Sequence, residues 1–161
     1  MTNFNEHALE MSIMELFKDE EYAYVSGDQI HRERTEVLLT DDLKQYFYNR
    51  YAKDGITPSE VDSIILMLRN IGGTIYEANK SVFKLISDGF IFNREDRTQK
   101  DLYIELIDFA APENNIFKAV NQFEIEGVNN QLRIPDGIVF VNGIPVVVLE
   151  FKSAVKENTT I

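Results

Sequence analysis

The chain has 161 residues, with 16 Lys and Arg against 27 Asp and Glu, and a net charge of −11 at pH 7. Non-specific DNA affinity comes mainly from Lys and Arg, so this charge argues against a free-standing DNA-binding protein. The sequence has no cysteine and two histidines. This excludes disulfides and thiolate metal sites, disfavours zinc, and leaves carboxylates as metal ligands.

The length fits a single domain over residues 1–161. No apolar run approaches the roughly 18 residues that span a bilayer. The first 17 residues lack the basic start and apolar middle of a signal peptide. We therefore expect a cytoplasmic protein with no membrane association.

The first predicted element is a helix from about Asn5 to Asp19, because apolar residues recur there at helical spacing. The stripe consists of Leu9, Ile13, Leu16 and Phe17. An aromatic, glycine-containing turn is predicted over Tyr22 to Asp28.

Helices are predicted for the next third of the chain. Thr40 is expected to cap a helix over Asp41 to Lys53. The sequence Thr57-Pro58-Ser59-Glu60 is a capping box with proline at the first helical position. A further helix is expected around Glu77 to Asp88, with Gly89 as its left-handed cap.

From Phe90 onward the spacing of apolar residues is typical of strands and no longer of helices. This predicts a mostly antiparallel or mixed sheet with helices packed on it. The predicted strands are Leu102 to Phe109, Phe117 to Glu126, Ile138 to Val141 and Val146 to Lys152.

The most informative segment is IPDGIVFVNGIPVVVLEFK, residues 134–152, which predicts two strands joined at Asn142-Gly143. The second arm is a continuous apolar run, typical of a central buried strand, with Glu150 and Lys152 near its end. A buried charge is costly unless it is paired or bound to a metal. These two residues are two apart and so share a face.

Asp136, Glu150 and Lys152 match the PD-(D/E)xK nuclease motif, and residues 134–152 resemble the nuclease segment of the R subunit of type I restriction-modification enzymes. One departure is that Ile134 separates Arg133 from the proline. Four earlier segments are also similar to that family: residues 36–39, 106–109, 114–117 and 120–123.

The resemblance implies an α/β, restriction-endonuclease-like fold, a mixed sheet flanked by helices, with a helical insert over about residues 36–89. It also implies a Mg²⁺-dependent endonuclease acting on double-stranded DNA. Asp136 and Glu150 would hold Mg²⁺, and Lys152 would orient the attacking water and stabilise charge on the phosphate. Glu6 or Glu10 could complete the site. Glu6 is preferred because it shares the predicted inward face, whereas Glu10 lies about 100° away.

The same resemblance implies that this chain is the N-terminal fragment of a larger subunit. ATP-driven motor domains would follow it, and modification and specificity subunits would be its partners. The chain itself has no G-x-x-x-x-G-K-[ST] sequence, so ATP would bind only to the full-length subunit.

Other interpretations stay open. The chain could be a non-catalytic assembly or DNA-positioning module with a nuclease-like fold, and a junction resolvase is disfavoured because no basic groove is evident. The motif could also be an ordinary hairpin with a terminal salt bridge. Asp108 is more readily explained as a turn-forming or capping residue than as a site residue.

The hairpin register gives a geometric prediction. A regular two-residue turn would put Asp136 opposite Leu149, on the face away from Glu150. We therefore predict a bulge, an odd register or a bend near Pro135. A three-residue connection, with Asp136 opposite Val148, is one such arrangement, and the carboxylates of Asp136 and Glu150 would lie roughly 4 to 6 Å apart.

Overall fold

The computed structural model describes residues 6–127 and 130–152. The chain divides into two compact units. The first, the sheet unit, combines residues 1–37 with 117–161, and the second, the inserted unit, comprises residues 38–116.

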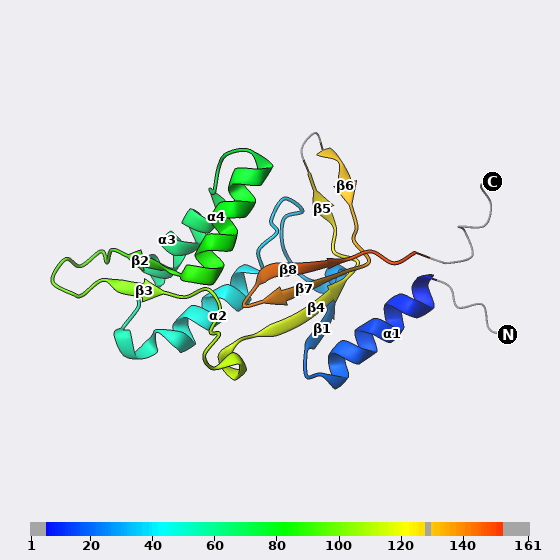
Figure 1. The fold of residues 1–161 in the computed structure, drawn as a ribbon, viewed down its shortest axis with the longest axis horizontal. Coiled ribbons are helices and arrows are strands. Elements are labelled where there is room, and N and C mark those ends of the chain that lie inside the picture. The colour runs from blue at the N-terminus through cyan, green and yellow to red at the C-terminus, as the bar shows by residue number, and fades with distance from the viewer. Residues whose placement is uncertain (1–5, 128–129, 153–161) are drawn as a thin grey trace. The chain divides into compact units, whose positions relative to one another are not determined.

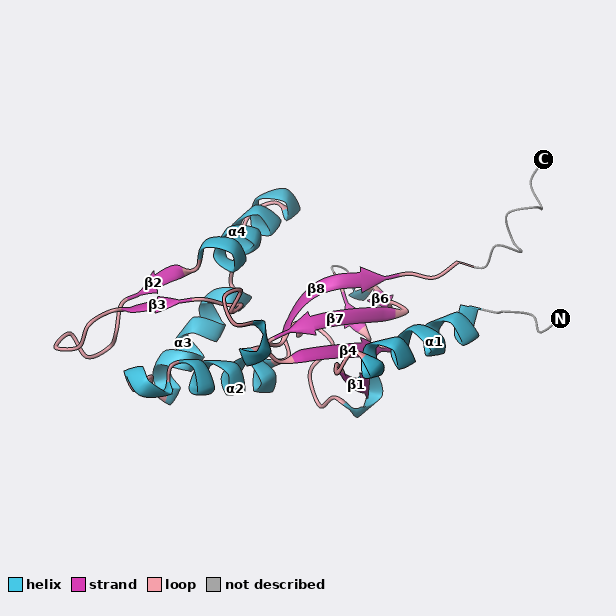
Figure 2. Ribbon diagram, turned by 60° about the horizontal axis from the view of Figure 1, so that its bottom comes forward, coloured by secondary structure: helices cyan, strands magenta, loops and turns pink. Residues whose placement is uncertain are grey.

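The sheet unit is built on a four-stranded mixed sheet in the order β1-β4-β7-β8 (Figures 1 and 2). β1 runs parallel to β4, and the other two pairings are antiparallel. The sheet strands are β1 (Ala23–Ser26), β4 (Phe117–Asn121), β7 (Gly137–Val141) and β8 (Ile144–Leu149). A separate ribbon pairs β5 (Ile125–Glu126) with β6 (Leu132–Arg133). The expected mixed α/β class is confirmed.

Helix α1 (Glu6–Asp19) packs against β1 and β4. The predicted helix is confirmed, but its predicted apolar stripe is wrong in part. Leu16 is 56% exposed, whereas Met14 and Glu10 are the buried side chains. The buried face is therefore rotated from the predicted one, because close approach to Gly137 of β7 brings Met14 inward.

The buried centre of the sheet is β7, in which every residue is buried. β8 was predicted to be a central buried strand, and this is wrong. Among the described strands β8 pairs only with β7, and Val146, Val147 and Val148 are all exposed. Glu150 and Lys152 are exposed as well, so burial does not require them to have partners.

The inserted unit carries three helices and a hairpin with its own buried side chains. Its elements are α2 (Thr40–Arg50), α3 (Pro58–Arg69), α4 (Ile75–Asp88), β2 (Phe90–Phe92) and β3 (Leu102–Ile104). The fully buried residues include Leu43, Phe47, Val61, Ile64, Ile104 and Leu106. The insert is therefore longer than predicted and includes the β2–β3 hairpin, because this hairpin contributes Ile104 to the same core.

Two capping boxes begin helices of the inserted unit. The predicted box of Thr57 and Glu60 is present, and Thr74 with Glu77 forms a second one at α4. The predicted cap by Thr40 is wrong, since α2 begins at Thr40 with Leu39 as its N-cap. Gly89 ends α4 at φ 64 and ψ −168, so its φ is positive as expected but its ψ lies outside the left-handed region.

Glu60 also anchors Arg94, and both side chains are buried. Its carboxylate accepts hydrogen bonds from Arg94 Nε (3.0 Å) and Nη2 (2.9 Å). Arg94 also donates to the carbonyls of Asp54 and Gly55, both at 2.7 Å. The hydrogen bonds from Arg94 are the largest cause that lowers the pKa of Glu60, to about 2. Burial alone would raise this pKa, but it only partly offsets the hydrogen bonds. This pair fixes the start of α3 to the segment after β2.

Two predicted segments differ in the structure. Tyr22 to Asp28 was expected to be a turn, but it contains β1, because parallel pairing with β4 makes a strand of this short edge segment.

The strand predicted from Leu102 to Phe109 ends at Ile104. Beyond it the Asp108 carboxylate accepts hydrogen bonds from two backbone N–H groups, of Ala110 and Ala111, and so forms a turn. Asp108 is thus the turn residue that was favoured.

None of the helices in the described part of the chain is both long and apolar enough to span a bilayer.

Candidate active site

The β7–β8 hairpin is bulged, as predicted. Its turn is a two-residue one, with Asn142 (φ 52) and Gly143 (φ 80) between paired Val141 and Ile144. The specific prediction of a three-residue connection is therefore wrong. The register instead shifts inside the strands, between the pairs that contain Val139 and Phe140, because one extra residue is accommodated in β8.

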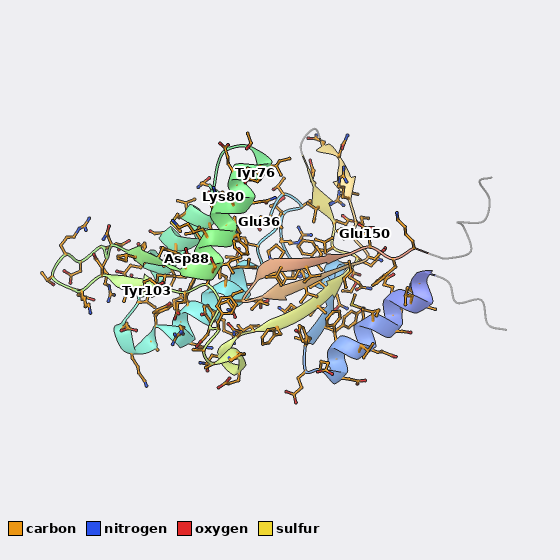
Figure 3. All side chains as sticks on the ribbon, in the orientation of Figure 1. Glu36, Tyr76, Lys80, Asp88, Tyr103 and Glu150 are labelled. Atoms are coloured by element: carbon orange, nitrogen blue, oxygen red, sulfur yellow. The ribbon has the colours of Figure 1, made fainter. Side chains whose placement is uncertain are left out.

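This shift brings the ends of the motif together. The last ladder pair is Gly137 with Leu149, so the same register carried one residue further puts Asp136 opposite Glu150. Asp136 stands in a bend, and its Oδ2 accepts a hydrogen bond from the N–H of Phe151. The Asp136 carboxylate therefore lies against the peptide bond that follows Glu150. Figure 3 shows Glu150 at the end of β8.

Lys152 follows two residues after Glu150 and is exposed. An exposed ammonium group at this position could meet a phosphate without displacing a packed neighbour. The distance of roughly 4 to 6 Å between the carboxylates of Asp136 and Glu150 stays a prediction.

On α1, Glu10 is the buried acidic residue, with 6% of its surface exposed. Its Oε1 accepts hydrogen bonds from Asn121 Nδ2 (2.7 Å) and Gln122 Nε2 (3.2 Å). Its Oε2 lies 3.6 Å from Nδ1 of His7. The side chain of Glu6 lies outside the described residues.

Glu10 belongs to the same end of the sheet as the motif. β4 pairs with β7 as far as Val120 and Ile138, and the two residues that follow Val120 are the ones that donate to Glu10. Residues 120–123 resemble the corresponding segment of the family, but no pattern in the sequence indicates a role for Asn121 or Gln122.

Asp136 and Glu150 would suit a hard cation, because such cations prefer carboxylate oxygens. Within residues 6–127 and 130–152, however, no three His, Asp or Glu side chains converge closely enough to hold a metal ion. Mg²⁺ commonly binds through only one or two carboxylates and keeps several waters beside substrate phosphates. The facing positions of Asp136 and Glu150 fit that kind of site.

A hairpin with an acidic pair at its open end and a lysine beyond it is the arrangement expected of a PD-(D/E)xK nuclease domain. Comparison with known proteins agrees: residues 3–160 match the family described as the type I restriction enzyme R protein N terminus. The chain belongs to this family.

Two relatives show the same relationship. The type I restriction enzyme HindI endonuclease subunit of Haemophilus influenzae is 32% identical over 146 residues, which cover 86% of this chain and 14% of the relative. The putative type I restriction enzyme MjaIXP endonuclease subunit of Methanocaldococcus jannaschii is 30% identical over 165 residues, covering 96% of this chain and 16% of the relative. The chain thus spans about a seventh of the length of these relatives.

Proposed function

We propose that this chain is the DNA-cleaving part of a type I restriction enzyme and hydrolyses phosphodiester bonds of double-stranded DNA with Mg²⁺. The observation that carries the proposal is the contact of the Asp136 carboxylate with the peptide after Glu150, which brings the two halves of the motif together. In the full-length subunit, cleavage would be coupled to ATP-driven translocation, and modification and specificity subunits would supply DNA recognition.

Each residue has a distinct proposed task. Asp136 and Glu150 hold the metal ion, which would lower the pKa of a bound water and neutralise charge on the phosphate. Lys152 orients the attacking water and stabilises negative charge developing on the phosphate. Glu6 and Glu10 stay the candidates for an additional carboxylate, and of these Glu10 is buried and accepts hydrogen bonds from Asn121 and Gln122.

The test uses the complete enzyme with three near-isosteric variants, Asp136→Asn, Glu150→Gln and Lys152→Met. Each should lower the rate of DNA cleavage by more than about 100-fold, because each removes a metal ligand or the charge beside the phosphate. ATP hydrolysis should stay at the wild-type rate. The control is Glu113→Gln, an exposed acid in the inserted unit, which should leave both activities unchanged.

A variant that cuts DNA at the wild-type rate would remove that residue from the site. If all three did so, the chain would be the non-catalytic DNA-positioning module instead.

A further inference from the structure

Helix α4 of the inserted unit is rich in apolar side chains, yet none of its 14 residues, all of which the structure describes, is buried. Tyr76 is 75% exposed and Phe83 71% exposed. The capping box of Thr74 and Glu77 begins the helix. The exposed aromatic side chains therefore stand on a regular helix with a defined start.

The apolar side chains of α4 form two arcs around the helix. At 3.6 residues per turn, the first arc spans about 100°. It holds the half-buried side chains Ala78, Val82, Leu85 and Ile86. Tyr76 and Phe83 lie about 60–80° beyond this arc. A surface helix normally covers one apolar stripe about 100° wide, so the first arc meets that need and the second is left uncovered.

The second arc defines the α4 stripe, which consists of Tyr76, Asn79 and Phe83. Their spacing of three and then four residues is the one at which a second helix contacts a helix face. The two rings lie about 10 Å apart along the helix axis, at 1.5 Å per residue, with the amide of Asn79 between them. Isolated exposed apolar residues are ordinary, whereas a row at helical spacing indicates a contact surface.

One edge of the α4 stripe is positively charged. Lys80 lies about 40° from Tyr76 around the helix, and Lys84 about 40° further; Tyr76 and Lys80 extend from the same part of α4 (Figure 3). In the described part of the chain neither lysine has an ion-pair partner. Glu77 accepts hydrogen bonds from Thr74, and Asp88 accepts one from Ser87. This edge is thus positive in a chain whose net charge is −11.

A second copy of the chain does not match this surface. Antiparallel packing of two α4 helices through the stripe would bring Lys80 against Lys80 of the other copy, and like charges in contact are costly. Duplex DNA does not match it either, because two lysines neutralise few phosphates and the rings add nothing to a backbone contact. Aromatic anchors beside a charged rim are typical of protein–protein interfaces.

We propose that the α4 stripe is a docking surface for a helix of another part of the complete enzyme, with apolar residues at matching spacing and Asp or Glu along the edge that faces Lys80 and Lys84. The apolar residues would cover Tyr76 and Phe83, and hydrogen bonding to Asn79 would fix the register. The matched segment makes up only 14% and 16% of the two relatives, which leaves most of their length to supply such a helix. The inference uses the proposed assembly of the enzyme but none of the nuclease residues.

The test places the photo-crosslinking residue p-benzoyl-phenylalanine at the position of Phe83 in the complete enzyme, and mass spectrometry identifies the crosslinked peptide. The expected product contains a protein segment with apolar residues at helical spacing and acidic residues along one edge. The control carries the same residue in place of Ser81, which is exposed on α4 but about 160° around the helix from Phe83. It should not give this product.

Two substitutions test the charge and the aromatic anchor. Lys80→Glu should lower the crosslink yield about 5-fold or more, because repulsion replaces attraction at the edge. Replacing the facing acid of the partner by Lys should restore the yield, whereas Lys53→Glu, a control at another exposed lysine of the inserted unit, should have no effect. Tyr76→Ala should also lower the yield, yet leave the unfolding temperature of the 161-residue chain unchanged, since Tyr76 is exposed and Ala favours a helix.

Each outcome decides the proposal. A crosslink to DNA, to α4 of a second copy or to a segment without acidic residues would overturn it, as would the absence of a crosslink or a full yield in Lys80→Glu. A lower unfolding temperature in Tyr76→Ala would assign Tyr76 to the packing of its own unit and overturn its docking role. Cleavage by the variants of Asp136, Glu150 and Lys152 is measured separately, so failure of one proposal is distinguishable from failure of the other.

Discussion

At the residue scale, the structure separates acids that stabilise the fold from those suited to chemistry. Glu60 is buried, paired with Arg94 and also engaged by backbone N–H groups. Asp108 is likewise occupied, and its pKa is lowered chiefly by the hydrogen bond from Asn114. Glu150 is exposed at a strand end. Glu60 and Asp108 thus have structural roles.

Glu60 gives a prediction about acid stability. Its pKa is about 2 in the folded chain against an ordinary value of 4.5, so its stabilising effect is fully present above pH 4.5 and is lost as the pH falls towards 2. At one pKa unit per 1.36 kcal/mol, this effect is roughly 3 kcal/mol. Glu60→Gln should lower the free energy of unfolding at pH 7 by about 3–5 kcal/mol, because Arg94 remains buried without its counter-charge.

The measurement is urea unfolding of both proteins between pH 2 and pH 7. The difference between them should be largest above pH 5 and should shrink towards pH 2, where wild-type Glu60 is itself neutral. A difference that does not change with pH would contradict the assignment.

At the element scale, apolar periodicity and capping motifs predicted most helices. The position of Asp136 relative to Glu150, in contrast, depends on the register of the β7–β8 hairpin. Proline and the Thr57 box located α3 because capping is a local interaction. The buried face of α1 could not be predicted in this way, since Met14 is drawn inward by contact with Gly137, far away in sequence. Gln122, which directly follows β4, has a φ of 52, and no local pattern predicted this left-handed conformation.

The turn of the β7–β8 hairpin provides a test of register. Gly143 has φ 80, so Gly143→Ala should lower the free energy of unfolding by about 1–2 kcal/mol through backbone strain. The matched control is Gly72→Ala, because an added Cβ there meets nothing within 4 Å and φ is not positive. Equal effects of the two substitutions in thermal unfolding would show that the turn does not constrain the hairpin.

At the scale of the whole molecule, the fold class and the family could be predicted from the hairpin motif and the change of period after Phe90. The extent of the inserted unit could not, because its helices and the β2–β3 hairpin share one core that no local pattern reveals. The burial of β8 was predicted wrongly for a similar reason. An apolar run such as Val146 to Leu149 does not indicate how many neighbouring strands it has.

The net charge of −11 gives a prediction for DNA binding. The isolated chain should bind duplex DNA only weakly at about 0.15 M salt, because few phosphates can be neutralised by its Lys and Arg residues. A fluorescence titration with labelled duplex should show no saturation below 1 μM protein, on the scale of typical non-specific affinities. Tight binding in this titration would mean that a strong DNA surface exists within these 161 residues.

Among the described strands β8 is the last of the four-stranded sheet, and this has a consequence for the chain in solution. A strand edge lined with apolar side chains is a template for pairing with another chain, and Val148 is 60% exposed. At high concentration, two copies should meet through their β8 strands and extend the sheet across both molecules. Val147→Lys should suppress this self-association in sedimentation measurements, since lysine on an edge strand opposes pairing. The strand that leads into Glu150 and Lys152 would then also be the surface through which isolated copies associate.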